Sequence, residues 1–310
     1  MKALAFPILL LVLVACTEAN VGKPQSVGEP YDVTLMATDK RLLKTVSGMM
    51  GVTMAGLPQE ERLFTVKTAK GKEVNAATMY ERTIVVVRRQ DGNTRIRYER
   101  NPYARDQLLV FIDTPSAEAL RADSAKTAKA LQRLIDQFET RVAMNHDRQN
   151  HNLKLMRTVE KTIGCNITIP SDIRASKTGK DFVWISDNGT RTMRNICVYA
   201  TPGTDCSANR LVDLRDSVMA RNIPGERQGM FMTTEHRAGL RHQRRGPFTV
   251  IHGLWEMKDD AMGGPFVSLS LPDTTRRRTI TAEAFLYAPS VDKAQTMRQL
   301  EALLYTLRLE

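Results

Sequence analysis

One short segment concentrates the side chains that could do acid/base chemistry. Residues 253–266 read GLWEMKDDAMGGPF, in which Trp255 is followed by the carboxylates of Glu256, Asp259 and Asp260. Carboxylates beside a tryptophan could act as a general acid and a general base, or could bind a sugar. The alternative interpretation is a strand that ends in a tight turn, in which glycine permits a backbone excursion. We favour the turn.

A second segment has the residue types of an anion site. Residues 236–245 read HRAGLRHQRR and contain Arg237, Arg241, Arg244 and Arg245. Guanidinium groups match phosphate and carboxylate with two parallel hydrogen bonds, so an anionic ligand is physically reasonable. The alternative is a solvated loop, which we favour. These four arginines and the four residues Trp255, Glu256, Asp259 and Asp260 are the candidate binding residues.

The established catalytic motifs are absent from the chain. There is no GxSxG elbow, HExxH pair, P-loop or GxGxxG turn. A match to SxxK, SDN and KTG exists, but KTG (177–179) and SDN (186–188) flank a predicted strand of ~20 Å and cannot easily converge. We therefore assign no catalytic residues, no metal site and no cofactor, and favour a non-enzymatic role.

The beginning of the chain has the pattern of an export signal. Lys2 precedes an apolar run that is too short for a resident membrane helix of ~20 residues. The run ends in Leu13-Val14-Ala15-Cys16, which resembles a bacterial lipobox. The resemblance implies that residues 1–15 are a signal peptide and that Cys16 becomes an acylated (palmitate-bearing) amino terminus. Since no acidic run follows Thr17, we expect an outer-membrane anchor that faces the periplasm.

Composition sets the class of partner. The chain has 310 residues, of which 42% are hydrophobic and 25% charged, and a formal net charge of +11. This is the composition of a globular protein with an excess of basic residues. Outside the cytoplasm the available polyanions are lipid head groups, lipopolysaccharide and cell-wall polymers. The expected partners are the membrane, through the lipid, and an anionic envelope polymer or a protein, but no nucleic acid.

The cysteines leave the disulfide pairing open. With Cys16 assigned to lipid, Cys165, Cys197 and Cys206 remain, an odd number that predicts at most one disulfide. Cys197 and Cys206 flank a Pro-Gly loop that could bring them together, and Cys165 could pair with either.

Hydrophobic periodicity divides the chain into two similar halves. A flexible tether is expected over residues 16–30, an N-terminal α+β half over 31–150 and a C-terminal α+β half over 151–310. Residues 94–99 and 107–113 predict a hairpin. A helical stretch begins after Ser116 and is expected to break in the polar segment 144–150, and a last helix is expected over 290–309. The predicted fold class is α+β, with antiparallel sheets and helices packed on one face.

The two halves end alike. Residues 110–116 (VFIDTPS) and 284–290 (AFLYAPS) each predict a strand, a Pro-Ser pair and the start of a helix. A duplicated unit would explain the match. So would chance, because strand-Pro-Ser-helix is a common local arrangement.

Several motifs together resemble a known family. The lipobox is followed by these segments, in chain order: KDFVW (180–184), RDSV (215–218), IPG (223–225), MFMTT (230–234), GLWEMK (253–258), MGGPFV (262–267) and YAP (287–289). They resemble an uncharacterised lipoprotein family of Bacteroidota that is defined as a domain of unknown function. The resemblance implies an envelope lipoprotein without an assigned activity. It brings no catalytic residues.

Two hypotheses follow from these observations. The first is a non-catalytic binding or structural module attached to the envelope by lipid. The second is an envelope hydrolase that uses Glu256, Asp259 and Asp260 near His252 and Trp255. An enzyme of this kind needs at least two of those carboxylates in one cleft, within reach of a common atom.

Overall fold

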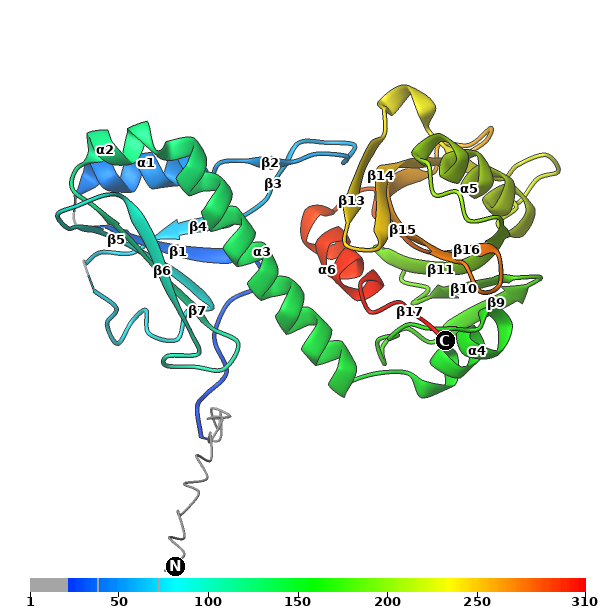
Figure 1. Ribbon diagram of the computed structural model, residues 1–310, viewed down its shortest axis with the longest axis horizontal. Helices are drawn as coiled ribbons and strands as arrows, with labels where there is room; N and C mark the ends of the chain where they lie inside the picture. Colours follow the sequence, from blue (N-terminus) through cyan, green and yellow to red (C-terminus); the bar gives the residue numbers. More distant parts are fainter. Residues whose placement is uncertain (1–21, 38, 72) are drawn as a thin grey trace, which may run out of the picture.

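The computed structural model describes residues 22–37, 39–71 and 73–310. The predicted signal peptide and Cys16 lie outside these residues. Two α+β domains lie side by side, and the long helix α3 (Ser124–Gln149) extends from the first towards the second (Figure 1). The predicted α+β class with two domains is confirmed.

The first domain is built on a five-stranded sheet in the order β4-β1-β5-β7-β6. Besides α3, its elements in chain order are β1 (Asp32–Ala37), α1 (Lys40–Met50), β2 (Thr53–Met54), β3 (Glu61–Arg62), β4 (Thr65–Thr68), β5 (Thr83–Arg89), β6 (Arg95–Arg100), β7 (Leu108–Thr114) and α2 (Ala117–Ala122).

The predicted hairpin of β6 and β7 in this sheet is confirmed. The other neighbours are parallel, contrary to the antiparallel sheet expected here. Long connections rather than tight turns join these strands, and such connections permit parallel pairing.

Alternation along the strands decides which face of this sheet the helices cover. Val85, Val87 and Val110 point towards α1, α2 and α3 and form one core with them. Ile84 and Leu109 point to the opposite face, where a smaller apolar cluster forms. The helices therefore pack on one face of this sheet, as predicted.

The second domain contains an antiparallel sheet in the order β12-β14-β15-β16-β11-β10-β9, with β13 paired to β14. Its elements in chain order are α4 (Leu153–Ile163), β8 (Cys165–Asn166), β9 (Ala175–Gly179), β10 (Phe182–Ser186), β11 (Met193–Pro202), α5 (Ala208–Asn222), β12 (Met232–Thr234), η1 (His236–Ala238), β13 (Arg241–Arg245), β14 (Phe248–Met257), β15 (Gly263–Asp273), β16 (Arg278–Tyr287), α6 (Ala294–Leu304) and β17 (Arg308–Leu309).

Helices cover both faces of the second sheet rather than the single face expected. Helices α4 and α6 pack on one side and α5 on the other. The reason lies in the central strands, where consecutive residues such as Ile196, Cys197, Val198 and Tyr199 are all buried. A strand that is apolar on both sides needs cover on both. The two sheets thus differ in topology, and the duplicated unit is not observed.

Three boundaries differ from the expected ones. The polar segment 144–149 stays helical, and α3 ends only at Gln149. The last helix begins at Ala294, not at Ser290. Residues 23–27 do not form a free tether, because backbone bonds fasten them to the first domain: Ser26 N–H donates to Arg105 O (3.0 Å) and Val27 N–H donates to Tyr80 O (2.7 Å).

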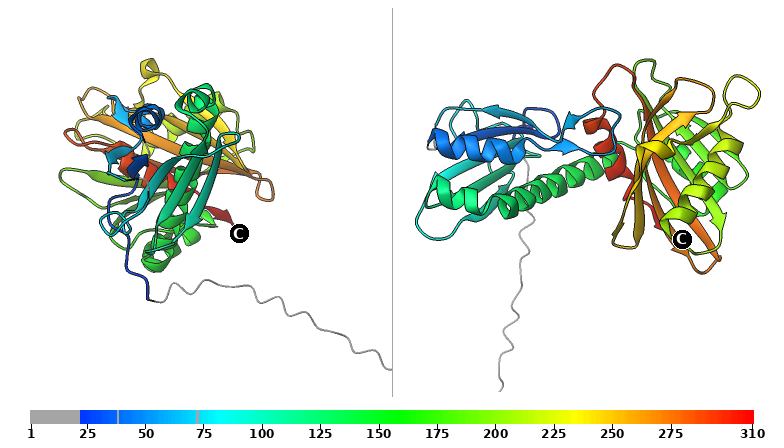
Figure 2. Two further views of the ribbon diagram at one scale, coloured as in Figure 1. Left: turned by 90° about the vertical axis from the view of Figure 1, so that its left-hand side faces the viewer. Right: turned by 90° about the horizontal axis from the view of Figure 1, so that it is seen from above.

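The domains contact one another through helices and an extended arm. Helix α6 lies between the second sheet and α3 (Figure 2). The arm formed by β2, β3 and their connection reaches from the first domain, and its Met54 and Leu57 pack against the second domain's core. Apolar contact therefore holds the two domains against one another.

Candidate functional site

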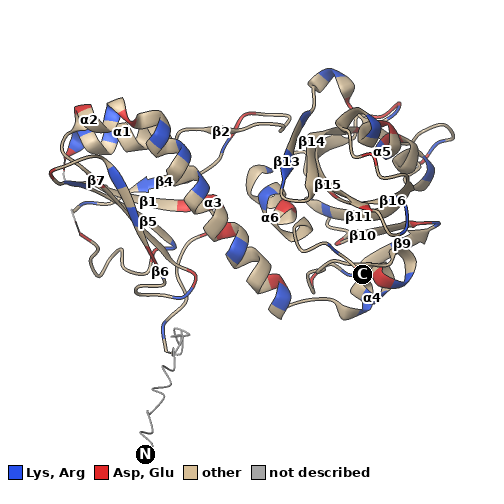
Figure 3. Cartoon of the chain, viewed as in Figure 1, with Lys and Arg blue, Asp and Glu red and all other residues tan. Residues whose placement is uncertain are grey.

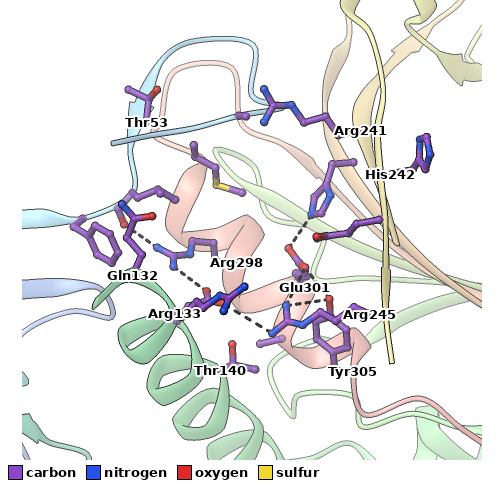
Figure 4. A pocket seen from close by; sticks show the side chains of 18 of the residues that line it. Thr53, Gln132, Arg133, Thr140, Arg241, His242, Arg245, Arg298, Glu301 and Tyr305 are labelled. Atoms are coloured by element: carbon purple, nitrogen blue, oxygen red, sulfur yellow. Dashed lines mark hydrogen bonds and ion pairs between the residues drawn. The ribbon is translucent and has the colours of Figure 1, made fainter. Parts of the chain in front are cut away.

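A cavity of about 860 Å³ lies between the two domains. Helix α3 and the segment around β2 form its first-domain wall, whereas β13, β14 and α6 form the opposite wall (Figure 4). Ligand sites are often found between domains and in cavities of this size. We therefore take this interdomain cavity as the candidate functional site.

One arginine in the cavity has a structural role. Arg298 of α6 donates to Leu63 O at 2.8 Å and to the Asp136 carboxylate at 2.9 Å. Its guanidinium carbon lies 3.3 Å from the centre of the Tyr31 ring. Since only 8% of the side chain is exposed, these contacts occupy the guanidinium and join the domains.

A hydrogen-bonded chain of side chains crosses the floor of the cavity. His252 Nε2 lies 2.9 Å from the Glu301 carboxylate, and Tyr305 donates to the same carboxylate at 3.1 Å. Arg245 donates to the Tyr305 hydroxyl at 3.1 Å. Burial alone raises the pKa of Glu301, but the hydrogen bonds from His252 and Tyr305 and the charge of Arg245 outweigh it and hold that pKa below 4.5. Glu301 is therefore a carboxylate at neutral pH.

Two other arginines in the cavity have no such partners. Arg133 of α3 and Arg241 of β13 line opposite walls, and their exposed guanidinium groups make no hydrogen bond or ion pair to any residue that the structure describes. Figure 3 shows Lys and Arg residues (blue) along both α3 and β13. The cavity's acidic residues, Asp136 and Glu301, are already engaged by other groups. The cavity therefore presents free guanidinium donors from two sides.

The four predicted basic residues separate into two groups. Arg241 and Arg245 line the cavity. Arg244 points to the other side of β13 and donates to Thr249 Oγ1 at 2.9 Å. Arg237 makes two bonds of 3.1 Å to Glu235. Because segment 241–245 is a strand, alternate side chains face opposite ways.

The structure does not bring the predicted carboxylates together. Trp255 is buried against Phe285, with ring centres 5.5 Å apart, and is a core residue. Asp259 and Asp260 are exposed in the turn after β14. Glu256 lies apart from them, where burial and then neighbouring Glu235 raise its pKa. None of the four lines the interdomain cavity, so the geometry that the hydrolase hypothesis needs is not found there.

The proposed disulfide is not formed. Cys165, Cys197 and Cys206 are all free thiols. Cys197 lies in the middle of β11, which continues to Pro202 and carries the following loop beyond the end of the sheet. Cys206 instead lies 3.8 Å from Thr279 Oγ1.

Sequence reasoning did not find several residues of the cavity. These residues lie on the amphipathic helices α3 and α6, in which charged residues normally face water, or directly after α6. They are Arg133, Asp136, Glu301 and Tyr305. Nothing in a helical pattern shows that the polar side of one helix faces a strand of another domain. The sequence did contain a signal for Arg241 and Arg245. Residues four apart on a strand lie on the same face, so their spacing indicated that both could line one site.

Comparisons with known proteins give family matches without an activity. Residues 26–147 match the model for "Domain of unknown function (DUF8532)", and residues 152–306 match that for "Domain of unknown function (DUF4837)". No curated protein matches the chain. Among solved structures, the Saccharomyces cerevisiae Ran-binding protein Mog1p is similar at 8% identity and a TM-score of 0.33, over 47% of this chain and 90% of that one.

Two further properties concern the part of the chain that the structure describes. No helix there combines the length and apolar character needed to cross a membrane. No group of three or more His, Cys, Asp or Glu side chains there could hold a metal ion.

Proposed function

This chain belongs to the DUF4837 family, a domain of unknown function, and from that premise we propose that it is a lipid-anchored binding protein of the cell envelope. Its ligand is an anionic envelope polymer or an acidic segment of a protein, held between the two domains. The role is one of binding rather than catalysis.

The observation that carries this proposal is the pair of free guanidinium groups in the interdomain cavity. Arg133 and Arg241 come from different domains and face a common space. Hydrogen bonds from guanidinium to phosphate or carboxylate are strong and directional. A ligand with two or more anionic groups could engage both walls at once.

The envelope location is supported by the beginning of the sequence and by the net charge. The segment Leu13-Val14-Ala15-Cys16 has the lipobox pattern, and the motifs of the mature chain resemble a lipoprotein family of Bacteroidota. An acylated Cys16 would hold the protein to a membrane, and we place it on the periplasmic side of the outer membrane. The formal charge of +11 suits a surrounding of anionic polymers.

Binding of defined polyanions to single-arginine variants tests the ligand. The probes are a short polyphosphate, poly-glutamate and lipopolysaccharide, titrated at low and at physiological ionic strength. Loss of a charge-assisted hydrogen bond costs about 1.5–3 kcal/mol, so Arg133→Ala and Arg241→Ala should each weaken binding by about tenfold or more.

Arg244→Ala is the matched control, because it removes the same charge from the same strand on the opposite face. It should leave binding almost unchanged. Equal losses for Arg241→Ala and Arg244→Ala would mean general attraction to a basic surface and would overturn the proposed site. So would failure of all three probes to bind at low ionic strength.

Mass spectrometry of the protein purified from membranes tests the anchor. We expect an amino terminus at Cys16 that carries acyl chains, and a Cys16→Ser variant that is not retained in the membrane fraction. An intact Met1 or an unacylated Cys16 would contradict the proposal.

A further inference from the structure

Exposed apolar and aromatic side chains gather at one end of the first domain. Val27, Tyr80 and Tyr103 are 60%, 41% and 38% exposed, and Val27 is the most exposed large hydrophobic residue that the structure describes. Scattered single residues of this kind need no explanation, but several at one location do. All three lie at the end of the sheet where β5 and β7 begin.

Backbone bonds hold these residues in one rigid group. Val27 N–H donates to Tyr80 O at 2.7 Å, and Arg105 N–H donates to Pro24 O at 2.8 Å. The Gln107 side chain donates to the carbonyls of Met79 and Glu81, both at 2.8 Å. It also accepts from the N–H of Tyr103 at 3.0 Å. The three exposed side chains are thus presented by a fixed surface and not by independent loops.

Charged side chains of both signs accompany them: Lys23 and Arg105 are basic, and Glu29 and Asp106 are acidic. Lys23 lies beside the group, and its ammonium donates to Asn101 O at 2.5 Å. The exposed Arg105 side chain has no partner among the described residues. Tyrosines with lysine and arginine are the residue types that favour the boundary between lipid head groups and water. Cations there are attracted to anionic head groups.

We infer that this membrane-facing surface, consisting of Lys23, Val27, Tyr80, Tyr103 and Arg105, lies on the head groups of the bilayer to which Cys16 is attached. The inference rests on the proposed lipid anchor. Cys16 and Gly22 are six residues apart, which limits the distance between them to ~20 Å. The membrane must therefore lie within that distance of Gly22, and this surface is the part of the described chain next to Gly22.

The tether also explains why a small surface is enough. An acyl anchor keeps the surface at high effective concentration near the bilayer, so a weak contact can still fix the orientation of the domain. The far end of the same sheet, where Arg88, Arg95 and Arg97 all pair with Asp113, would then lie ~20 Å further from the membrane.

Depth-dependent quenching of an introduced tryptophan tests this orientation. The lipidated full chain is placed in vesicles of phosphatidylethanolamine and phosphatidylglycerol that contain brominated lipid. The variants are Tyr80→Trp and Tyr103→Trp, both conservative in size and shape. The control is Val291→Trp, which is similarly exposed in the second domain (37%). The native Trp184 and Trp255 contribute an equal background to all three and to the parent chain.

We expect the added fluorescence of Tyr80→Trp and Tyr103→Trp to be quenched at least about twofold, and that of Val291→Trp to stay unquenched. Adding Arg105→Glu to Tyr80→Trp should reduce the quenching in these anionic vesicles but not in vesicles of neutral lipid.

Mass spectrometry of the same samples separates the two possible failures. If Cys16 is acylated but Tyr80→Trp is quenched no more than Val291→Trp, the orientation is wrong and the anchor stands. Dimers that Tyr103→Ser dissociates, with no quenching, would assign the surface to a second copy and also overturn the inference. If Cys16 is not acylated, the anchor and the inference fail together.

Discussion

At the scale of single residues, the most unusual group is a buried ion pair in the second domain. Arg215 of α5 donates to both oxygens of Glu283 at 2.9 Å, and its guanidinium lies 3.9 Å from the centre of the Phe266 ring. Glu283 is fully buried and Arg215 is 2% exposed. In the sequence, Arg215 belongs to an ordinary amphipathic helix. The pattern cannot show that this charge faces the sheet, because its partner is 68 residues away.

Removal of one partner should destabilise the protein strongly. Arg215→Met leaves the Glu283 carboxylate buried without a counter-charge, which typically costs about 3–5 kcal/mol. Denaturant titration, followed by the fluorescence of Trp184 and Trp255 in the same domain, measures the free energy of unfolding.

The double variant Arg215→Met/Glu283→Leu is the control for this prediction. It removes both charges and should recover most of the lost stability, since apolar pairs can replace buried ion pairs. A double variant as unstable as Arg215→Met would show that packing of the arginine, rather than the unpaired carboxylate, causes the loss.

At the scale of elements, part of the fold could be predicted from the sequence. The alternation of apolar residues identified the hairpin of β6 and β7, because neighbouring strands in a hairpin are specified locally. It could not give the parallel pairs of the first sheet, which join segments as distant as β1 and β5. For the site, sequence reasoning found Arg241, Arg245 and His252, but not the residues that α3 and α6 contribute.

The start of α6 shows how a distant residue can move a predicted boundary. Ser290 has the right type for a helix cap, yet the helix begins four residues later. There Glu61 of β3 accepts hydrogen bonds from the backbone N–H groups of Lys293 (2.6 Å) and Ala294 (2.7 Å). The arm of the first domain thus supplies the cap of a second-domain helix. A carboxylate also interacts favourably with the positive end of the helix dipole.

Substitution of Glu61 should therefore weaken the domain contact. Glu61→Ala is expected to cost about 1–2 kcal/mol and to increase hydrogen exchange at the first turn of α6. Glu61→Gln, which keeps an acceptor without the charge, should cost less. Exposed Glu60 gives the control, and Glu60→Ala should change neither quantity. Equal effects of Glu60→Ala and Glu61→Ala would exclude the cap as the cause.

At the scale of the whole molecule, the cavity and the domain contact share the same side chains. Asp136 of α3 accepts from Arg298 of α6 at 2.9 Å and also lies 3.9 Å from Arg245 of β13. Glu301 in turn holds His252 and Tyr305. Since Asp136 belongs to α3 and Arg298 and Arg245 belong to the second domain, the ion pairs that orient these two arginines also link the domains. A ligand that engages both Arg133 and Arg241 would add to this contact and should stabilise the joined arrangement.

The hydrogen bonds of Glu301 on the floor of the cavity predict how acid affects the molecule. The pKa of Glu301 in the folded protein lies below its ordinary value of 4.5, so the folded state binds fewer protons than the unfolded state between these two values. Glu301 thus contributes stability above its ordinary pKa, and this contribution is lost as the pH falls through the lower, folded value.

The free energy of unfolding of the parent chain minus that of Glu301→Gln isolates the effect. This difference should shrink below about pH 4.5. Glu160→Gln, at an exposed position of α4, should show no such trend. A parent-minus-variant difference that does not depend on pH would mean that Glu301 stabilises the second domain through its shape and not through its charge.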